Sequence, residues 1–133
     1  MAKAKPRRSV TLVEELMAEA SAVLSKAQAF AAMGMGQTAQ PLWASAAALG
    51  ERIAPLLDAD GEAREAAVYR MSAASCYEKA GDPSRATNLY QAALAGPLLP
   101  VTRNEVQAML TACLGKVKAE SAPRRSRRVA SAS

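Results

Sequence analysis

Acidic side chains near the start of the sequence are the first candidates for chemistry. Glu14, Glu15 and Glu19 carry carboxylates, which can transfer protons or bind metal ions. Their positions also fit the solvent-exposed face of a helix, and we favour this simpler interpretation. The sequence contains no histidine, so the commonest general base and metal ligand is missing.

A second acidic segment resembles only the beginning of a calcium-binding loop. Asp58, Asp60 and Gly61 have residue types found early in such a loop. The glutamate that completes the coordination of calcium at the end of the loop is replaced by Tyr69. We therefore expect these aspartates to cap the next helix instead of binding a cation.

Neither the glycines nor the cysteines form a recognised cofactor motif. Gly34 and Gly36 lack the third glycine and the preceding strand of a phosphate-binding loop. Cys76 and Cys113 match no metal or redox spacing, and we expect both to be buried thiols in a reducing cytoplasm. The sequence thus predicts no catalytic residue, no metal ion, no cofactor and a protein that is not an enzyme.

Positive charge is concentrated at the two ends of the chain, whose net charge is +5. The body between them, residues 9–118, has nine basic and 11 acidic residues. We predict disordered basic tails over residues 1–10 and 119–133, because these segments lack the apolar content that would offset ordering entropy. The tail residues that could contact nucleic acid weakly, without reading its sequence, are Arg7, Arg8, Arg124, Arg125, Arg127 and Arg128.

Alanine is the most informative component of the body, since the chain has 32 alanines and alanine has the highest helix propensity. We predict an all-α domain over residues 11–118, and no apolar run is long enough to cross a membrane. Two capping boxes, at residues 11–14 and 102–105, predict the starts of the first and last helices. Five helices are expected. The first runs from residue 11 to near Gly34, and the second starts at about Thr38, with Pro41 in its first turn and a far end weakened by Gly50 and Pro55. The third runs from about Glu62 to Ala80, the fourth from Pro83 to Gly96, and the fifth from residue 102 to about Val117.

The body also repeats itself at a spacing of 47 residues. Small residues align with small residues, aromatic with aromatic, and glycine with glycine. The first unit, about residues 12–57, carries Ala27, Phe30, Gly34, Ala39, Trp43 and Ala46. The second unit, about residues 61–96, carries Ala74, Tyr77, Gly81, Ala86, Tyr90 and Ala93. In each unit, the small residues would let two helices approach closely, and the glycine would end the first of them.

This spacing resembles the tetratricopeptide repeat over about residues 12–117, with residues 103–117 as the capping helix that such arrays carry. Several features depart from the family pattern: the period exceeds the usual ~34 residues, and Val23 and Arg70 stand where a large residue is expected early in the first helix of each unit. The prolines that end each unit are displaced to Pro55 and to Pro97 or Pro100. A generic helical bundle whose alanines happen to coincide is the alternative.

The resemblance implies a right-handed α–α superhelix with a groove lined by the first helix of each unit. Mapped by position, the groove residues are Ser21, Leu24, Gln28, Ala31 and Ala32 in the first unit and Val68, Met71, Ser75, Glu78 and Lys79 in the second. Leu24 and Gln28 stand where the family's carboxylate-binding members have a lysine and an asparagine. A helix or an extended apolar segment is therefore the expected ligand, although these residues could instead simply pack against neighbouring helices.

We therefore predict a non-enzymatic protein-interaction or scaffolding module with a protein or peptide partner. Self-association is also expected, because two units and a capping helix leave a face uncovered, to which Leu12, Leu16 and Leu98 could contribute. The alternative function is a nucleic-acid- or ribosome-associated protein that acts through its basic tails. The tails could also serve only to keep the protein in solution.

Overall fold

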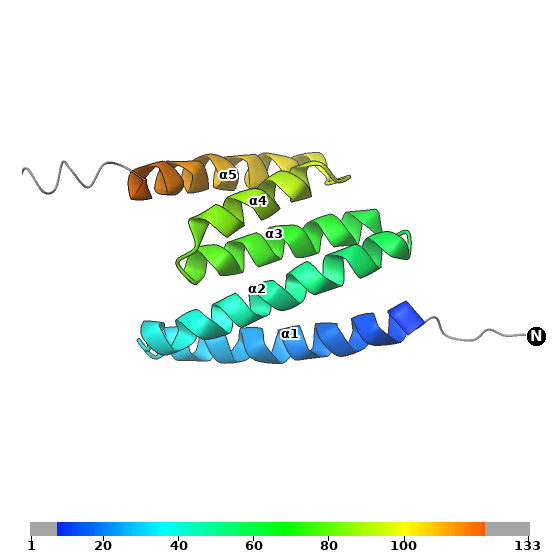
Figure 1. Ribbon diagram of the computed structural model, residues 1–133, viewed down its shortest axis with the longest axis horizontal. Coiled ribbons are helices and arrows are strands. Elements are labelled where there is room, and N and C mark those ends of the chain that lie inside the picture. Colours follow the sequence, from blue (N-terminus) through cyan, green and yellow to red (C-terminus); the bar gives the residue numbers. More distant parts are fainter. Residues whose placement is uncertain (1–7, 122–133) are drawn as a thin grey trace, which may run out of the picture.

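Five helices and their connections make up the part of the chain that the computed structural model describes, residues 8–121 (Figure 1). No strand occurs in this range, which confirms the prediction of an all-α fold. The helices are α1 (Arg8–Ala32), α2 (Gly36–Ala59), α3 (Ala63–Lys79), α4 (Pro83–Leu94) and α5 (Pro100–Glu120). None of these helices is both long enough and apolar enough to cross a membrane.

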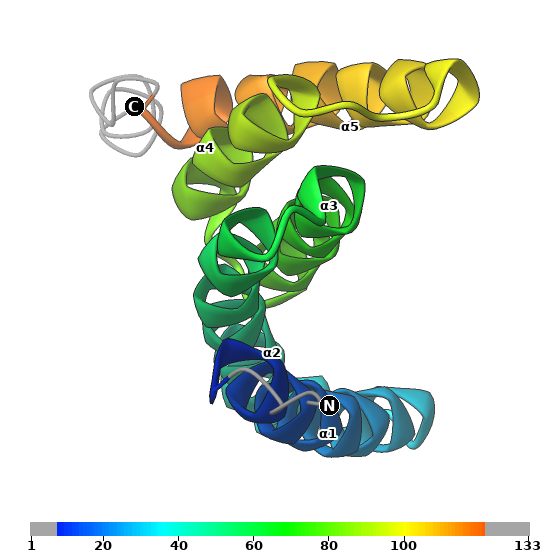
Figure 2. The same ribbon diagram turned by 90° about the vertical axis from the view of Figure 1, so that its right-hand side faces the viewer.

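The helices stack in chain order, and each packs mainly against its neighbours in sequence. Figure 2 shows this stack from the side: α2 and α4 lie along one edge, and α1, α3 and α5 along the other. The stack is curved, with α1 and α5 at its two ends. This arrangement places α1 and α3 on the same edge, on either side of α2.

Three of the connections have the same geometry. Gly34, Gly61 and Gly81 follow α1, α2 and α3 with φ values of 77°, 80° and 87°. After each glycine, the next backbone N–H donates to the carbonyl five residues earlier, as in Met35 to Phe30 at 2.9 Å. Glycine adopts this left-handed conformation without the steric cost of a Cβ atom, so these turns end their helices locally.

Two predicted helix starts are wrong. The helix α1 begins at Arg8, before the capping box expected at residues 11–14. The helix α5 begins at Pro100, with Leu99 extended at its N-cap, so Thr102 lies inside the first turn. The reason in α5 is the proline, whose fixed φ suits the first helical position and takes precedence over the later capping sequence.

The start of α3 also differs from the expectation that an aspartate caps it. Its N-cap is Glu62, with no side-chain capping bond. Asp58 instead accepts a 2.7 Å hydrogen bond from Arg70, about two turns inside α3. The start of α4 agrees with the sequence, because Asp82 is its N-cap and accepts from the Arg85 N–H at 3.2 Å.

The helix α2 is longer and more continuous than the sequence indicates. It starts at Gly36 rather than near Thr38, so Pro41 falls in the second turn. It also passes through Pro55, whose ring was expected to weaken this end. Ile53 and Ala54, next to this proline, are 0% and 1% exposed, so tertiary packing holds the helix together there.

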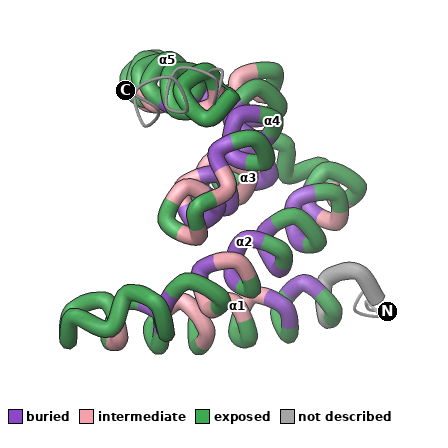
Figure 3. The backbone as a smooth tube through the Cα atoms, turned by 60° about the vertical axis from the view of Figure 1, so that its left-hand side comes forward, coloured by how far each residue is buried: buried purple, intermediate pink, exposed green. Residues whose placement is uncertain are grey.

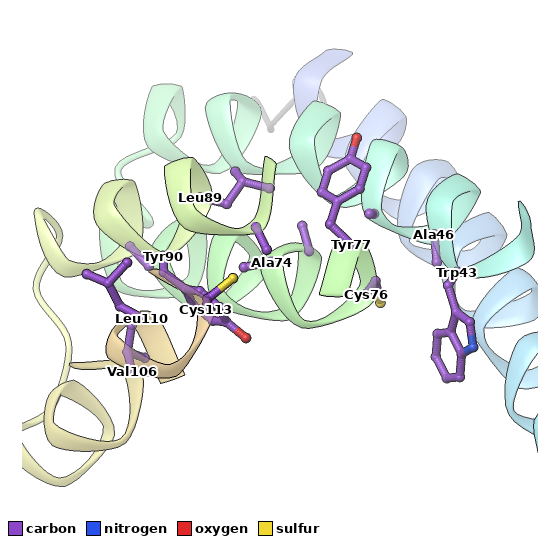
Figure 4. Close-up of a cluster of buried hydrophobic side chains, with 14 of the residues drawn as sticks. Trp43, Ala46, Ala74, Cys76, Tyr77, Leu89, Tyr90, Val106, Leu110 and Cys113 are labelled. Atoms are coloured by element: carbon purple, nitrogen blue, oxygen red, sulfur yellow. The ribbon is translucent and has the colours of Figure 1, made fainter. Parts of the chain in front are cut away.

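Buried residues lie along the faces where successive helices meet, as Figure 3 shows. The structure buries nine of the 12 repeat positions, and Phe30 is partly buried while Gly34 and Gly81 lie in the turns. The nine are Ala27, Ala39, Trp43, Ala46, Ala74, Tyr77, Ala86, Tyr90 and Ala93. Figure 4 shows part of this core, in which Tyr90 lies beside Leu110 and Cys113 of α5.

Leu16 and Leu98, which were expected to contribute to an uncovered face, are also buried. Leu16 belongs to a second apolar cluster between α1 and α2, and Leu98 packs in the main core. Of the three residues expected there, Leu12 is the one left exposed, at 38%. Two of the three leucines are therefore engaged in packing within the chain.

Small residues set the close approach of α2 and α3. A Cβ atom added to Gly50 would lie 3.0 Å from the Cβ of Ala73 and 3.5 Å from the carbonyl oxygen of Tyr69. A similar contact joins the connection after α4 to α3, where a Cβ on Gly96 would lie 2.9 Å from Ala67. The alanine-rich composition thus serves helix packing as well as helix formation.

Gly50→Val should lower the free energy of unfolding by about 1–3 kcal/mol, because the branched side chain would overpack the α2–α3 contact. Gly115→Val is the matched control, since a Cβ on this helical glycine meets nothing within 4 Å. Its effect should stay within about 0.5 kcal/mol. Urea denaturation followed by circular dichroism measures both values, and equal effects of the two substitutions would contradict the packing described here.

Candidate binding groove between the first and third helices

A groove of about 250 Å³ runs between α1 and α3, over α2. All three helices contribute to its lining, and no lining residue carries a charged side chain at neutral pH. The lining residues are Met17, Ala20, Ser21 and Leu24 of α1, Ala46 and Gly50 of α2, and Val68, Tyr69, Ser72, Ala73 and Cys76 of α3.

The groove exists because the residues at its base are small. Ala46 and Gly50 of α2 are buried, as is Ala73 of α3, and none of them has a side chain larger than a methyl group. Longer side chains from α1 and α3, including Met17 and Leu24, form the walls. The space is therefore apolar at its base and over most of its walls.

Two serine hydroxyls add polarity at the exposed edge of the groove. Ser21 of α1 and Ser72 of α3 line it from opposite walls, and both residues are exposed. A serine hydroxyl can both donate and accept a hydrogen bond. The groove thus combines an apolar interior with hydrogen-bonding groups at its edge, as ligand-binding pockets commonly do.

The titratable groups in the groove are held in their neutral forms. Burial raises the pKa of the Cys76 thiol, and the nearby ammonium of Lys79 only partly opposes this shift. Burial also raises the pKa of the Tyr69 phenol, with a further contribution from the carboxylate of Glu65. A thiol with a raised pKa is a poor nucleophile at neutral pH, so these groups suit binding better than reaction.

Between α3 and α5, Tyr90, Glu78 and Lys116 form a hydrogen-bonded cluster. The Tyr90 hydroxyl donates to Glu78 at 2.5 Å, and the Lys116 ammonium donates to the same carboxylate at 2.9 Å. Burial, followed by the bond to Glu78, strongly raises the pKa of the Tyr90 phenol. Glu78, expected from the sequence to face a ligand, instead connects α3 to α4 and α5.

The structure places some of the predicted groove residues together and separates others. Leu24 lines the groove, and so do Ser21 and Val68. Ala31 and Lys79 lie in a shallow depression near the α1–α2 turn, where the Lys79 ammonium stands 4.9 Å from the centre of the Trp43 ring. The predicted residues that line neither space are Gln28, Ala32, Met71, Ser75 and Glu78.

Sequence reasoning missed several lining residues because it mapped them from a repeat pattern. The missed residues are Met17, Ala20, Ala46, Gly50, Tyr69, Ser72, Ala73 and Cys76. The spacing of the lining residues as a whole offers a usable signal. Met17, Ser21 and Leu24 recur on one face of α1, and Tyr69, Ser72 and Cys76 recur on one face of α3. Matching these two stripes would have identified both walls.

The other candidate sites give no further centre. The described part of the chain does not include Arg7 or the four arginines of residues 124–128. Arg8 is the first residue of α1, and only its backbone is described. Within the described part of the chain, no three histidine, cysteine or acidic side chains gather as a metal site would require.

No protein-family model, curated protein or solved structure matches this chain. The assignment of a function therefore depends on the geometry of the groove and on the chemistry of its residues.

Proposed function

We propose that the protein is a non-enzymatic, tetratricopeptide-like interaction module that binds an extended segment of a partner protein in the groove between α1 and α3. The repeat spacing supports the family resemblance. So do the matching glycine turns after α1 and α3, each of which follows an aromatic residue of the repeat, Phe30 or Tyr77. The groove itself supports the binding function.

The size of the groove is the observation that carries the proposal. Its volume of about 250 Å³ exceeds that of an apolar protein cavity of about 150 Å³ known to bind benzene. It lies below the range of about 300–1,000 Å³ typical of pockets for small-molecule ligands. The space therefore fits one large apolar side chain, such as phenylalanine, leucine or methionine, presented by a polypeptide.

The two serines favour an extended segment over a helix. In an extended segment, the backbone N–H and C=O groups beside the anchoring side chain are free to form hydrogen bonds. Ser21 and Ser72 can reach such groups from opposite walls, since both residues are exposed and line the groove. A helix would have its backbone groups already paired and would leave these hydroxyls to water.

Charges around the groove give the bound segment a preferred direction. The Glu65 carboxylate raises the pKa of Tyr69 electrostatically, so its negative charge acts on this end of the groove. The Lys79 ammonium acts on Cys76 with the opposite sign. We expect a basic residue in the partner on the Tyr69 side of the anchor and an acidic residue on the Cys76 side.

Selection from a library of random displayed peptides tests this function. The expected result is a consensus with one large apolar anchor, a basic residue on one side of it and an acidic residue on the other. Immobilised protein with Leu24→Asp should fail to enrich this consensus, because a carboxylate would then lie in the wall of the groove. Enrichment of peptides without an apolar anchor, or an unchanged consensus with this variant, would contradict the proposal.

A further inference from the structure

The wall that α3 contributes to the groove continues toward the start of this helix as two carboxylates. Tyr69 and Ser72 line the groove. Glu65 and Glu62 stand one and two turns before Tyr69 on the same face of α3. Both carboxylates line a shallow depression that shares Val68 with the groove. The apolar groove therefore opens at this end onto an acidic surface.

These two carboxylates are not used within the described part of the chain. Among residues 8–121, Glu62 and Glu65 form no ion pair and accept no side-chain hydrogen bond, whereas Glu51 and Glu78 each do. Arg64 also lines the depression, but it points about 100° around the helix from Glu65. Both carboxylates are exposed and available to a positively charged ligand.

The distances along α3 define a register for a bound segment. At 1.5 Å per residue, Glu65 and Glu62 lie ~10 and ~15 Å along the helix from Ser72. In an extended segment alternate side chains face the same way, and the second and fourth residues from an anchor lie ~7 and ~13 Å from it. Long basic side chains at these two positions would reach the carboxylates when the anchor lies beside Ser72.

One segment of this sequence has the pattern that the register requires. Residues 122–133 lie outside the described part of the chain. Val129 is their largest aliphatic residue, and Arg127 and Arg125 stand two and four positions before it. No charged residue follows Val129, so the segment brings no like charge to the end of the groove near Lys79. Its apolar and charged residues thus match the groove in order and in spacing.

This segment must come from another copy of the chain. The Lys116 ammonium donates to Glu78 at 2.9 Å, so the last turns of α5 lie beside the end of α3. Figure 1 shows that α3 and α5 run in the same direction. Glu62 lies ~24 Å back along α3 from Glu78, whereas the four residues from Ser121 to Arg125 span at most ~14 Å. The same chain therefore cannot bring Arg125 to the acidic end of its own groove.

We propose that the groove between α1 and α3 binds residues 125–129 of a second copy of this chain, with Val129 as the anchor and Arg125 and Arg127 at the acidic end. This inference rests on the proposed function, because it names an occupant of the same groove. Valine is smaller than the side chain that would fill the groove, so the contact is weak and a partner with a larger anchor displaces it.

Substitutions of the anchor test the proposal in the full-length protein. The average mass of the unmodified protein, measured by analytical ultracentrifugation, should rise with concentration. Val129→Asp should weaken this association about 10- to 100-fold, because the buried anchor is lost. Val129→Leu should strengthen it about fourfold, since one more CH₂ group is buried. An unchanged association in both variants would overturn the proposal.

The alternation of the arginines provides a matched control. Arg125→Glu with Arg127→Glu should abolish association, because both side chains face the carboxylates. Arg124→Glu with Arg128→Glu makes the same change in net charge on the side of an extended segment that faces away from the groove. This control should retain most of the association. Equal losses in the two pairs would contradict the register.

An exchange of charges identifies the acidic end of the groove. Glu62→Lys with Glu65→Lys should abolish association, and adding the two glutamates at positions 125 and 127 to the same chain should restore it. Failure of this restoration would overturn the proposal. Loss of association in Lys3→Glu with Lys5→Glu, but not in the Arg125 and Arg127 variant, would overturn it too, because the first residues of the chain would then be the occupant.

The peptide selection described above separates this inference from the proposed function. If the unmodified protein stays monomeric at every concentration while a selected peptide binds the groove, only the second copy is excluded as the occupant. If the protein stays monomeric and no peptide with an apolar anchor is enriched, both proposals fail.

Discussion

Tyr90→Ala should lower the free energy of unfolding by about 3–5 kcal/mol, the range found when a large buried aromatic residue is truncated. Tyr90 is completely buried, and it packs against α5 in the core shown in Figure 4. Its hydroxyl also donates to Glu78 of α3. One side chain on α4 therefore joins three helices, and its removal should leave a cavity that the remaining residues cannot fill.

Tyr90→Phe separates packing from hydrogen bonding. The ring stays, but the hydrogen bond to the Glu78 carboxylate is lost, which should cost about 1.5–3 kcal/mol. Lys116 still contacts Glu78, so this carboxylate does not become unpaired. Urea denaturation gives both free energies. If neither substitution changes the stability, the cluster between α3, α4 and α5 does not hold these helices together.

The parts of the fold that could be predicted from the sequence are those determined by neighbouring residues. Gly34 and Gly81 identify the ends of α1 and α3, because a positive φ is a local requirement that glycine meets best. Asp82 identifies the start of α4 for a similar reason, since its carboxylate reaches a backbone N–H in the first turn. Each of these signals acts within a few residues.

The sequence was misleading where a local signal competes with a stronger influence, either tertiary packing or a second local signal. Pro55 was expected to weaken the end of α2, but the buried residues around it keep the helix intact. The threonine of residues 102–105 was expected to cap α5, but Pro100 starts the helix earlier. In both cases the local signal is genuine, but residues outside it decide where the helix begins or ends.

The groove could not be predicted from the sequence because three helices form it. The base of the groove depends on two small residues. The repeat pattern assigns Ala46 to helix packing and leaves Gly50 unassigned. Whether small residues leave a groove or are covered depends on the distance between α1 and α3. Between α3 and α5, by contrast, the Tyr90–Glu78–Lys116 cluster joins the helices through side chains that lie far apart in the sequence.

Ser72→Trp should weaken the binding of a selected peptide about 10- to 100-fold. Ser72 is exposed and lines the groove, so an indole at this position can fill the groove without disturbing the core. Side chains on helices lean toward the N-terminus, which directs the indole toward Val68 and the interior of the groove. The peptide would then lose the burial of its anchor, worth about 1.5–3 kcal/mol for a large apolar side chain.

The measurement that tests the proposed function most directly is a calorimetric titration of one selected peptide into three proteins: the unmodified chain, Ser72→Trp and Ser84→Trp. Ser84 is an exposed serine on α4 that does not line the groove, so its substitution controls for the added indole. We expect that only Ser72→Trp loses affinity, while all three proteins unfold at similar temperatures. Equal affinity of the peptide for all three proteins would show that the segment binds elsewhere, and the groove would not be the binding site.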